Sequence, residues 1–457
     1  MRMEYDDAAW ERSDNIFDEF KKRIVTSDVL LAVTNFMASY RDGVRPVDRA
    51  RIADVGAFNL CFRMVFEDGF SSLLRFPCPG RVMFPEEKVR NEVAVMTYLK
   101  QNTNIPVPSI IHHGMGDASP AGLGPFILME YVEHASNMTA QLRVPGYERG
   151  DRPFLDPDIE EEKLKFLYGQ LAEILLELSE LSFDKIGSLE KVADGWDISN
   201  RPLTMNMNEL VQLGNFPPRM LPQSPFSTAS SYYQSLAETE FMHLTTQRND
   251  AVDSEDDCRS KYVARKLFCK LATENRLRDH TIPDCGAFKL FCDDLRPTNV
   301  LLDDNMNITA VIDWEFTYAA PLEFTYSPPW WLLLEMPEEW PRGIADWSKV
   351  YEKRLETFLL ALKRKEDAAI ETGRLVEGQR LSGRMRESWD NGDFWVNYGA
   401  RKSWAFDVVW PIIDGKFFGG SDGETTMSLD AIDKEEMGPF IYKKLEDSKR
   451  RVLDNWD

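Results

Sequence analysis

The sequence contains little cysteine and no long apolar run. Six cysteines are spread over 457 residues, and no two of them form a C-x-x-C pair. This excludes a disulfide-stapled scaffold and predicts reduced thiols. The acidic first fifteen residues lack the apolar core of a secretory signal, and no stretch approaches the ~18 apolar residues that span a bilayer. We therefore expect a cytoplasmic protein without membrane contact.

Positive charge is also scarce. The chain carries 54 lysines and arginines against 76 aspartates and glutamates, a net charge of −22. Most of such a surface repels a phosphate backbone, which argues against nucleic acid as a partner and favours a neutral or cationic small molecule. Hydrophobic residues make up 43% of the chain, as in folded proteins, and its length fits two or three structural units.

Hydrophobic periodicity divides the chain into three parts. Apolar residues at helical spacing predict helices up to about residue 44. A β-rich run, broken by Gly56 and by the turn Glu67-Asp68-Gly69, then predicts strands at 52–55, 60–66 and 71–76. A helix is predicted over 85–100, followed by two more strands at 109–112 and 125–130. The rest is mainly helical, including 236–278. The predicted fold class is α+β, with a helical extension over 1–48, a lobe with an antiparallel five-stranded sheet and one main helix over 49–133, and a larger helical lobe over 134–457.

The most informative stretch is 291–316, FCDDLRPTNVLLDDNMNITAVIDWEF. If 300–302 and 309–312 pair around a turn centred on Met306, Asn299 and Asp313 lie at equal distance from that centre and return to the same end of a hairpin. Carboxylate and amide oxygens suit Mg²⁺. Asp294, just before the hairpin, is placed to accept a hydroxyl proton. These are the parts that phosphoryl transfer from ATP requires, although any one of them alone could serve turn chemistry.

A second group of candidates lies in the sheet lobe. The loop Gly56-Ala57-Phe58-Asn59 contains one glycine, and Arg75 lies near the end of the third predicted strand. Glu92 shares an apolar helical stripe with Val89, and a buried acid needs a partner. We expect Arg75 to be that partner and the two together to hold the α- and β-phosphates. A purely structural salt bridge is the alternative.

Residues 292–299, CDDLRPTN, followed by Ile312-Asp313-Trp314-Glu315, resemble the aminoglycoside phosphotransferase and choline kinase family, in particular its fungal branch. The likeness continues through FILMEYV at 126–132. It implies a two-lobed protein-kinase-like fold with ATP and Mg²⁺ as cofactors. The site residues that it implies are Asp294 as catalytic base, Asn299 and Asp313 as metal ligands, Gly56, Phe58, Arg75 and Glu92 on the nucleotide, Glu130 to Val132 as the hinge at adenine, and Glu315 near the metal.

The chain departs from the family pattern at two places. Cys292-Asp293 stands where many relatives carry His-Gly, and Arg75 where they often carry lysine. Arginine still binds phosphate through its planar guanidinium. Cysteine lacks the hydrogen bonds of imidazole, so the catalytic loop must be held differently, and Asp293 could raise the pKa of Asp294 or be turned outward.

Acceptor-side residues are marked less clearly. Asp293, Glu315 and Trp330 are candidate substrate contacts. The tryptophans at 389, 395, 404 and 410 could line a pocket, although such residues are more often core. The acidic pairs Asp256-Asp257 and Glu338-Glu339 could attract a cationic acceptor, or could be solvated faces.

Three functions fit these residues. The leading hypothesis is an ATP- and Mg²⁺-dependent phosphotransferase that acts on a hydroxyl of a small molecule. The second is a catalytically inactive kinase fold that binds nucleotide or protein, suggested by Cys292, Asp293 and the single-glycine loop. A protein Ser/Thr kinase is disfavoured because Asp313-Trp314-Glu315 replaces D-F-G and no A-P-E follows. No motif identifies the acceptor or the oligomeric state.

Overall fold

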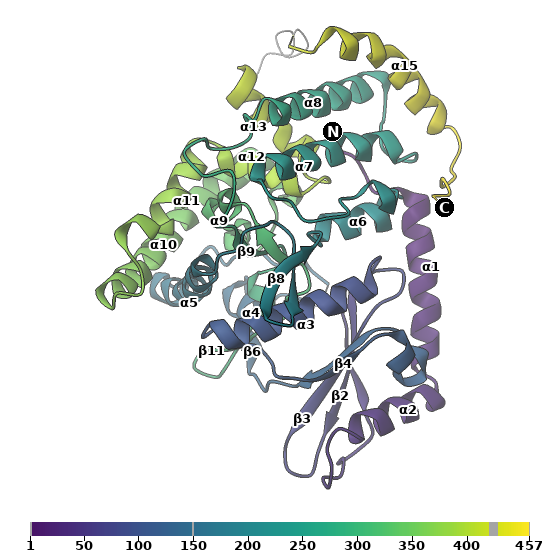
Figure 1. Cartoon of the computed structure of the whole chain (residues 1–457), viewed down its shortest axis with the longest axis vertical. Coiled ribbons are helices and arrows are strands. Elements are labelled where there is room, and N and C mark those ends of the chain that lie inside the picture. The colour runs from purple at the N-terminus through teal and green to yellow at the C-terminus, as the bar shows by residue number, and fades with distance from the viewer. Residues whose placement is uncertain (1, 149, 420–427, 457) are drawn as a thin grey trace.

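The computed structural model describes residues 2–148, 150–419 and 428–456, which form two lobes (Figure 1). The smaller lobe is built on an antiparallel five-stranded sheet in the order β1-β2-β3-β5-β4. Its strands are β1 (Arg51–Val55), β2 (Asn59–Val65), β3 (Ser71–Pro77), β4 (Ile110–Gly114) and β5 (Phe126–Glu130), and α3 (Pro85–Asn102) is its main helix. The predicted strands, helix and α+β fold class are confirmed, with ends that differ by two residues at most.

Alternating burial in β2 explains why this strand could be predicted from the sequence. In β2, Leu60, Phe62 and Met64 are buried, and the residues between them are partly exposed. This alternation is the period of two that a strand with one buried face requires.

Two further helices cover the sheet on the side of those buried residues. They are α1 (Asp7–Ile24) and α2 (Ser27–Ala38), as the periodicity predicted. Phe17, Phe20 and Val33 share one hydrophobic core with Phe62 and Phe76 of the sheet. The extension is therefore packed into the smaller lobe, and the domain boundaries expected near residues 48 and 133 stay predictions.

The larger lobe is mainly helical. Its longest helices, α5 (Glu161–Glu180) and α10 (Ile344–Glu371), pack against each other. The others are α4 (Met138–Leu142), α6 (Met205–Leu213), α7 (Ala229–Thr246), α8 (Glu255–Thr273), α9 (Leu322–Tyr326), α11 (Leu381–Asp390), α12 (Asp393–Arg401), α13 (Phe406–Phe418) and α15 (Ala431–Asp447). Within the described residues, no helix is both long and apolar enough to cross a membrane.

The stretch expected to be helical over 236–278 is confirmed as mainly helical, and it is divided between α7 and α8. Asp250 has a positive φ of 56° between α7 and α8, a conformation that no helix can contain. Ser254 then caps α8 by accepting a hydrogen bond from the Asp257 N–H at 3.1 Å.

Short strands in the larger lobe position the stretch 291–316, and two others form an unexpected hairpin. They are β6 (Ser136–Asn137), β10 (Val300–Leu302) and β11 (Ile308–Val311) in one sheet, and β9 (Lys289–Cys292) paired with β12 (Thr317–Ala320). The hairpin of β7 (Ser188–Val192) and β8 (Gly195–Asn200) was not predicted. Most of its residues are exposed, so its sequence carries no clear alternation.

Candidate nucleotide and metal site

Asp294 and Asn299 lie in the loop between β9 and β10, and both are buried. The Asn299 amide Nδ2 donates to the Asp294 carbonyl at 2.8 Å and to Asp294 Oδ2 at 3.0 Å. Arg296 Nε lies 2.9 Å from Asp294 Oδ1. Burial raises the pKa of Asp294 to about 6 against the influence of Arg296, and the charges of Asp313 and Glu315 also raise it. The loop therefore fixes this carboxylate at both oxygens.

The hairpin returns Asn299 and Asp313 to the same end, with a small correction to the expected register. Val300 pairs with Val311, and the Ile312 N–H donates to the Asn299 carbonyl at 2.9 Å. Asn299 thus stands opposite Ile312, and Asp313 lies one residue beyond. Leu302 pairs with Ile308, so the turn is centred on residue 305 and not on Met306, and the bulge between Leu301 and Leu302 makes up part of this displacement.

Asp313 has the two properties of a ligand-facing carboxylate. Its φ is +62°, in the left-handed region that non-glycine residues rarely occupy and that is enriched at functional sites. Its side chain is 28% exposed. Asn299 turns Nδ2 toward Asp294, and within the described residues no donor contacts its Oδ1. Arg75 pairs with Asp313 Oδ1, so the groups available to a hard cation such as Mg²⁺ are the Asn299 amide oxygen and Asp313 Oδ2.

The predicted pair of Arg75 and Glu92 is confirmed. Arg75 on β3 forms ion pairs with Glu92 on α3 and with Asp313, and its side chain and that of Glu92 are buried. The guanidinium thus joins the sheet, the helix and the hairpin end that carries Asp313. A fork of several N–H donors is suited to such shared contacts.

A second buried cation was missed in the sequence. Lys88 on α3 lies 2.5 Å from Glu315 Oε2 and donates to Asn59 Oδ1 at 2.7 Å, while Asn59 Nδ2 donates to Glu315 at 2.7 Å. Burial alone would raise the pKa of Glu315, but Lys88 and Arg75 hold it below its usual value. Lys88 lies one helical turn before Glu92, and this spacing was the signal available in the sequence.

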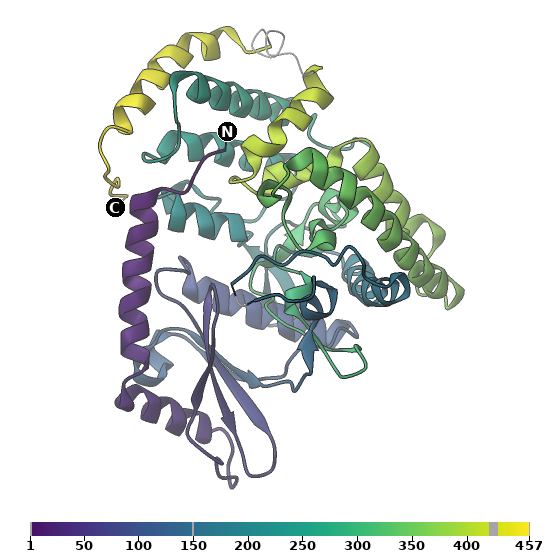
Figure 2. The ribbon, with the colours of Figure 1, turned by 180° about the vertical axis from the view of Figure 1, so that it is seen from behind.

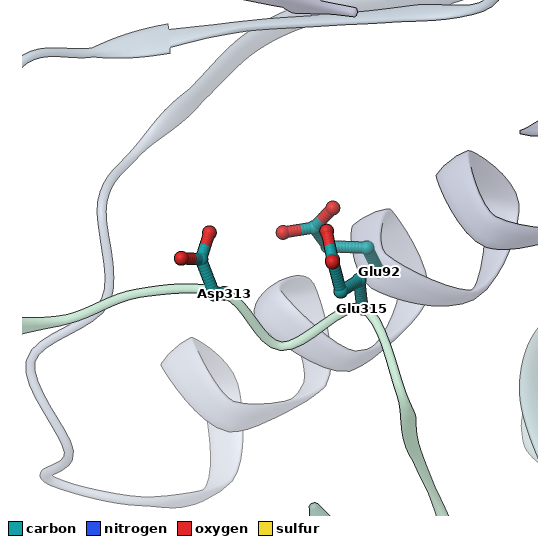
Figure 3. A group of neighbouring side chains, drawn as sticks. All are labelled: Glu92, Asp313 and Glu315. Carbon is teal, nitrogen blue, oxygen red and sulfur yellow. The ribbon is translucent and has the colours of Figure 1, made fainter. Parts of the chain in front are cut away.

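Figure 3 shows three neighbouring carboxylates, Glu92, Asp313 and Glu315, whose oxygens lie within 4.8 Å of one another. Such a cluster could hold a metal ion. Arg75 and Lys88 already pair with these acids, so the cluster is close to charge balance without one. Asp313, the most exposed of the three acids, remains the member suited to a metal, together with Asn299.

A cavity of about 480 Å³ lies between the lobes, and we call it the interlobe cavity. Its volume is within the range of about 300–1,000 Å³ that small-molecule and cofactor sites occupy. It brings together most of the predicted nucleotide-site residues. These are Gly56, Phe58, Arg75, Glu130, Val132, Asp294, Asn299 and Asp313, with Glu315 also in the wall. Glu92 is not part of the cavity wall and contacts the wall residue Arg75 from behind, through their ion pair.

The hinge segment at the end of β5 offers backbone groups to this cavity. The Glu130 N–H donates to the Ser109 carbonyl at 2.9 Å, and His134 Nδ1 donates to the Val132 carbonyl at 2.9 Å. In the part of the chain that the structure describes, the Val132 N–H has no acceptor. It is therefore available to the edge of a flat heterocycle.

A second cavity, of about 240 Å³, adjoins the first. Four residues line both cavities: Ala57, Phe58, Asp294 and Arg296. The second cavity also contains the predicted candidates Asp293 and Trp330 and the acidic pair Glu338-Glu339. Glu315, the third candidate substrate contact, lines the interlobe cavity instead. Asp257 of the other acidic pair forms an ion pair with Lys261 at 2.8 Å on α8.

The tryptophan series divides between core and cavity. Trp404 lines the second cavity beside Trp330. Trp389 and Trp395 pack with Trp347 in the hydrophobic core, as the commoner behaviour of such residues predicts.

The loop that carries Asp294 has Cys292 in place of a histidine, and other contacts hold it in position. Cys292 Sγ donates a long hydrogen bond of 3.9 Å to the Asp313 carbonyl. Asp293 Oδ2 accepts from the Met205 N–H at 3.1 Å, and Asp293 Oδ1 lies 3.8 Å from Arg401. Asp293 therefore ties the loop to the start of α6, while its side chain remains part of the cavity wall.

Comparison with curated proteins gives two distant relatives. Clavilactone A biosynthesis cluster protein Y of Ampulloclitocybe clavipes is 28% identical over 284 residues, which cover 60% of this chain and 62% of that protein. Altered inheritance of mitochondria protein 9 of Debaryomyces hansenii is 22% identical over 310 residues, 60% of this chain and 48% of that protein. The chain thus matches less than two thirds of the length of either relative.

Solved structures give similar but weak matches. Macrolide 2'-phosphotransferase type I has 14% identity and a TM-score of 0.42 over 90% of this chain and 98% of that one. Plasmodium vivax ethanolamine kinase has 11% identity and a TM-score of 0.38 over 90% and 83%. Both scores are below 0.5, so the assignment does not rest on them. The model of the phosphotransferase enzyme family matches residues 62–324, more than half of the chain. This match shows that the protein, with its two-lobed α+β fold, belongs to the phosphotransferase enzyme family.

Proposed function

We propose that the protein transfers the γ-phosphoryl group of ATP, with Mg²⁺, to a hydroxyl group of a small molecule. The observation that carries this proposal is the position of Asp294, a buried carboxylate that lines both the interlobe cavity and the second cavity. A group at this junction can contact a nucleotide on one side and an acceptor on the other. Phosphoryl transfer requires such a meeting point.

Each residue of the site has a role in this proposal. Asp294 accepts the hydrogen bond of the acceptor hydroxyl and orients it, while Asn299 and Arg296 fix the carboxylate. Arg75 contacts the phosphates, and the backbone of Glu130 to Val132 contacts adenine. Asn299 Oδ1 and Asp313 hold Mg²⁺, which when bound neutralises the charge of the transferred phosphoryl group.

The second cavity indicates a cationic acceptor. Its lining contains six acidic side chains, from Glu4, Glu209, Asp293, Asp294, Glu338 and Glu339, and three basic ones, from Arg2, Arg296 and Lys402. Burial raises the pKa of Glu209 to about 7 against the nearby Lys402, and Asp293 and Glu338 raise it further. A cationic group would relieve this clustering of negative charge.

The inactive kinase fold is the competing proposal, and Cys292 is its best support. The loop geometry favours the active enzyme, because Asp294 is held by Asn299 and Arg296 although no imidazole precedes it. A cytoplasmic location is part of the proposal, since all six cysteines are free thiols, as a reducing compartment keeps them.

The direct test is phosphate transfer with Mg·ATP and a panel of amine-bearing and neutral alcohols, followed by mass spectrometry of the acceptors. We expect a phosphorylated acceptor with the wild type, strong loss with Asp294→Asn, and wild-type behaviour with Asp304→Asn. Asp304 is an exposed aspartate in the turn of the same hairpin and serves as the matched control. Nucleotide binding without transfer to any acceptor would favour the inactive fold.

A further inference from the structure

The segment of residues 2–6, just before α1, lies against the larger lobe (Figure 2). Residues 2–5 of this segment line the second cavity. Two buried residues anchor the segment. The Met3 N–H donates to Asp407 Oδ2 at 3.1 Å. Asp6 caps α1 and accepts two hydrogen bonds from Asn249 Nδ2, at 2.9 and 3.0 Å. The segment is therefore a fixed part of the fold.

Next to these anchors, Arg2 and Tyr5 form part of the cavity wall. Arg2 makes an ion pair of 2.5 Å with Glu339, another wall residue. The Tyr5 ring packs edge-to-face on Trp404, with ring centroids 4.7 Å apart. Both side chains are thus positioned by the wall of the larger lobe, and the Tyr5 ring has little freedom to move.

Two polar groups in this cavity have no protein partner. Among residues 2–148, 150–419 and 428–456, no hydrogen bond or ion pair joins the Tyr5 hydroxyl or the Glu209 carboxylate to another group. Burial raises the pKa of Tyr5 to about 12, and the charge of Glu209 is the next cause. Both residues line the second cavity, so one ligand in it can contact both groups. Partly buried polar groups without partners are costly unless a ligand or water satisfies them.

The same segment is continuous with a helix that is fixed to the smaller lobe. In α1, Ser13 Oγ donates to the Gly80 carbonyl at 2.5 Å, and Asp14 forms an ion pair with Arg81 at 2.6 Å. Ala57 and Phe58, from the glycine loop of that lobe, line the second cavity as well. Both lobes therefore contribute to the wall that contains Tyr5.

We propose that Tyr5 and Glu209 are specificity-determining residues, which together bind the ammonium group of an amine-bearing alcohol. An ammonium group donates three hydrogen bonds, and the carboxylate and the phenolic oxygen both accept. The segment of residues 2–6 is the wall that holds Tyr5 in place. This inference rests on the proposed phosphotransferase function and deepens it.

The test compares acceptors that differ only in charge: glucosamine with glucose, and 3-aminopropan-1-ol with propane-1,3-diol. KM and kcat are measured for the full chain and for Tyr5→Phe, Glu209→Gln and the control Tyr442→Phe, at a 70% exposed tyrosine on α15. Tyr5→Phe keeps the ring that packs on Trp404 and removes only the hydroxyl. We expect the wild type to prefer the amine of at least one pair.

Tyr5→Phe and Glu209→Gln should each raise KM for that amine about tenfold, because each removes a hydrogen bond to a charged group. KM for the neutral partner and for ATP should stay within about twofold, because neither contact involves them. Transfer without amine preference, or with equal preference in all variants, would overturn this inference and leave the proposed function intact. Absence of transfer to any acceptor by the wild type would overturn both.

Discussion

At the residue scale, Arg75 shares its guanidinium between two carboxylates, Glu92 and Asp313. Arg75→Leu should lower the free energy of unfolding by about 3–5 kcal/mol, because it leaves Glu92 buried and charged without its partner. The double variant Arg75→Leu/Glu92→Leu should recover most of this stability and still bind Mg·ATP weakly. Urea unfolding and titration calorimetry measure the two effects. Wild-type affinity in the double variant would mean that the pair is only a structural salt bridge.

Glu240 on α7 provides a pH-dependent test of the interior. Burial raises its pKa to about 8 against Arg265 and the Ser403 hydroxyl, which donates to Oε1 at 2.6 Å. A raised folded pKa means that the folded state holds a proton that the unfolded state releases above its usual pKa of about 4.5. The stability contribution is thus complete below that value and is lost as the pH rises to about 8.

We therefore expect the free energy of unfolding to fall between these pH values, with Glu240 contributing up to about 1.4 kcal/mol per pH unit. Glu240→Gln cannot lose a proton and should have a flatter profile, whatever its stability at one pH. Urea unfolding at a series of pH values from 5 to about 9 measures the two slopes. Parallel profiles for the wild type and the variant would contradict the raised pKa.

The roles of residues were predictable from the sequence only where the residues lie close together along the chain. Asp294, Asn299 and Asp313 share one short stretch, so their spacing predicted that they meet. The neighbours of Lys88 and Glu209 come from distant parts of the chain, such as Glu315 for Lys88. A single sequence contains no signal for such a contact beyond a charged residue near an apolar stripe.

At the element scale, most of the sheet lobe was predictable because its strands are short apolar runs separated by turns that contain glycine, and β2 also alternates in burial. The β7–β8 hairpin and the break between α7 and α8 were not. The former is largely exposed, and the latter depends on one residue with positive φ, Asp250. Apolar patterns therefore predicted most elements that face a core, and they gave no signal for the exposed β7–β8 hairpin.

Alanine substitutions at two glycines of the sheet lobe should have opposite effects on protein stability and on KM for ATP. A Cβ at Gly56 would meet its nearest atom at 3.6 Å, whereas a Cβ at Gly80, with φ of +81°, would lie 2.5 Å from the Ser13 carbonyl oxygen. Gly80→Ala should cost at least about 1–2 kcal/mol of stability, from the backbone conformation alone. Gly56→Ala should leave the unfolding midpoint nearly unchanged and raise KM for ATP, because the added methyl group narrows the approach of the phosphates.

Thermal unfolding and ATP kinetics of the two variants test this assignment. Gly80→Ala should unfold at a lower temperature with little change in KM for ATP. Equal KM values for ATP in Gly56→Ala and the wild type would show that the loop does not approach the phosphates closely.

At the scale of the whole molecule, two lobes meet around the interlobe cavity, and α1 ties them together on one side (Figures 1 and 2). The net charge of −22 is opposite to what a tetra-anionic nucleotide needs. Under the proposed function, the binding of ATP depends on Mg²⁺ and on a few local cations, chiefly Arg75. The same proposal assigns the acidic lining of the second cavity to a cationic acceptor.

The central claim is that Asp294 orients the acceptor between two cavities. It is tested most directly by the single-turnover rate of phosphate transfer from Mg·ATP to an amine-bearing alcohol, in the wild type and in Asp294→Asn. We predict a rate loss of about 10²–10⁴-fold with nearly unchanged affinity for Mg·ATP, because the carboxylate acts on the acceptor hydroxyl. A variant that transfers phosphate at the wild-type rate would contradict the account.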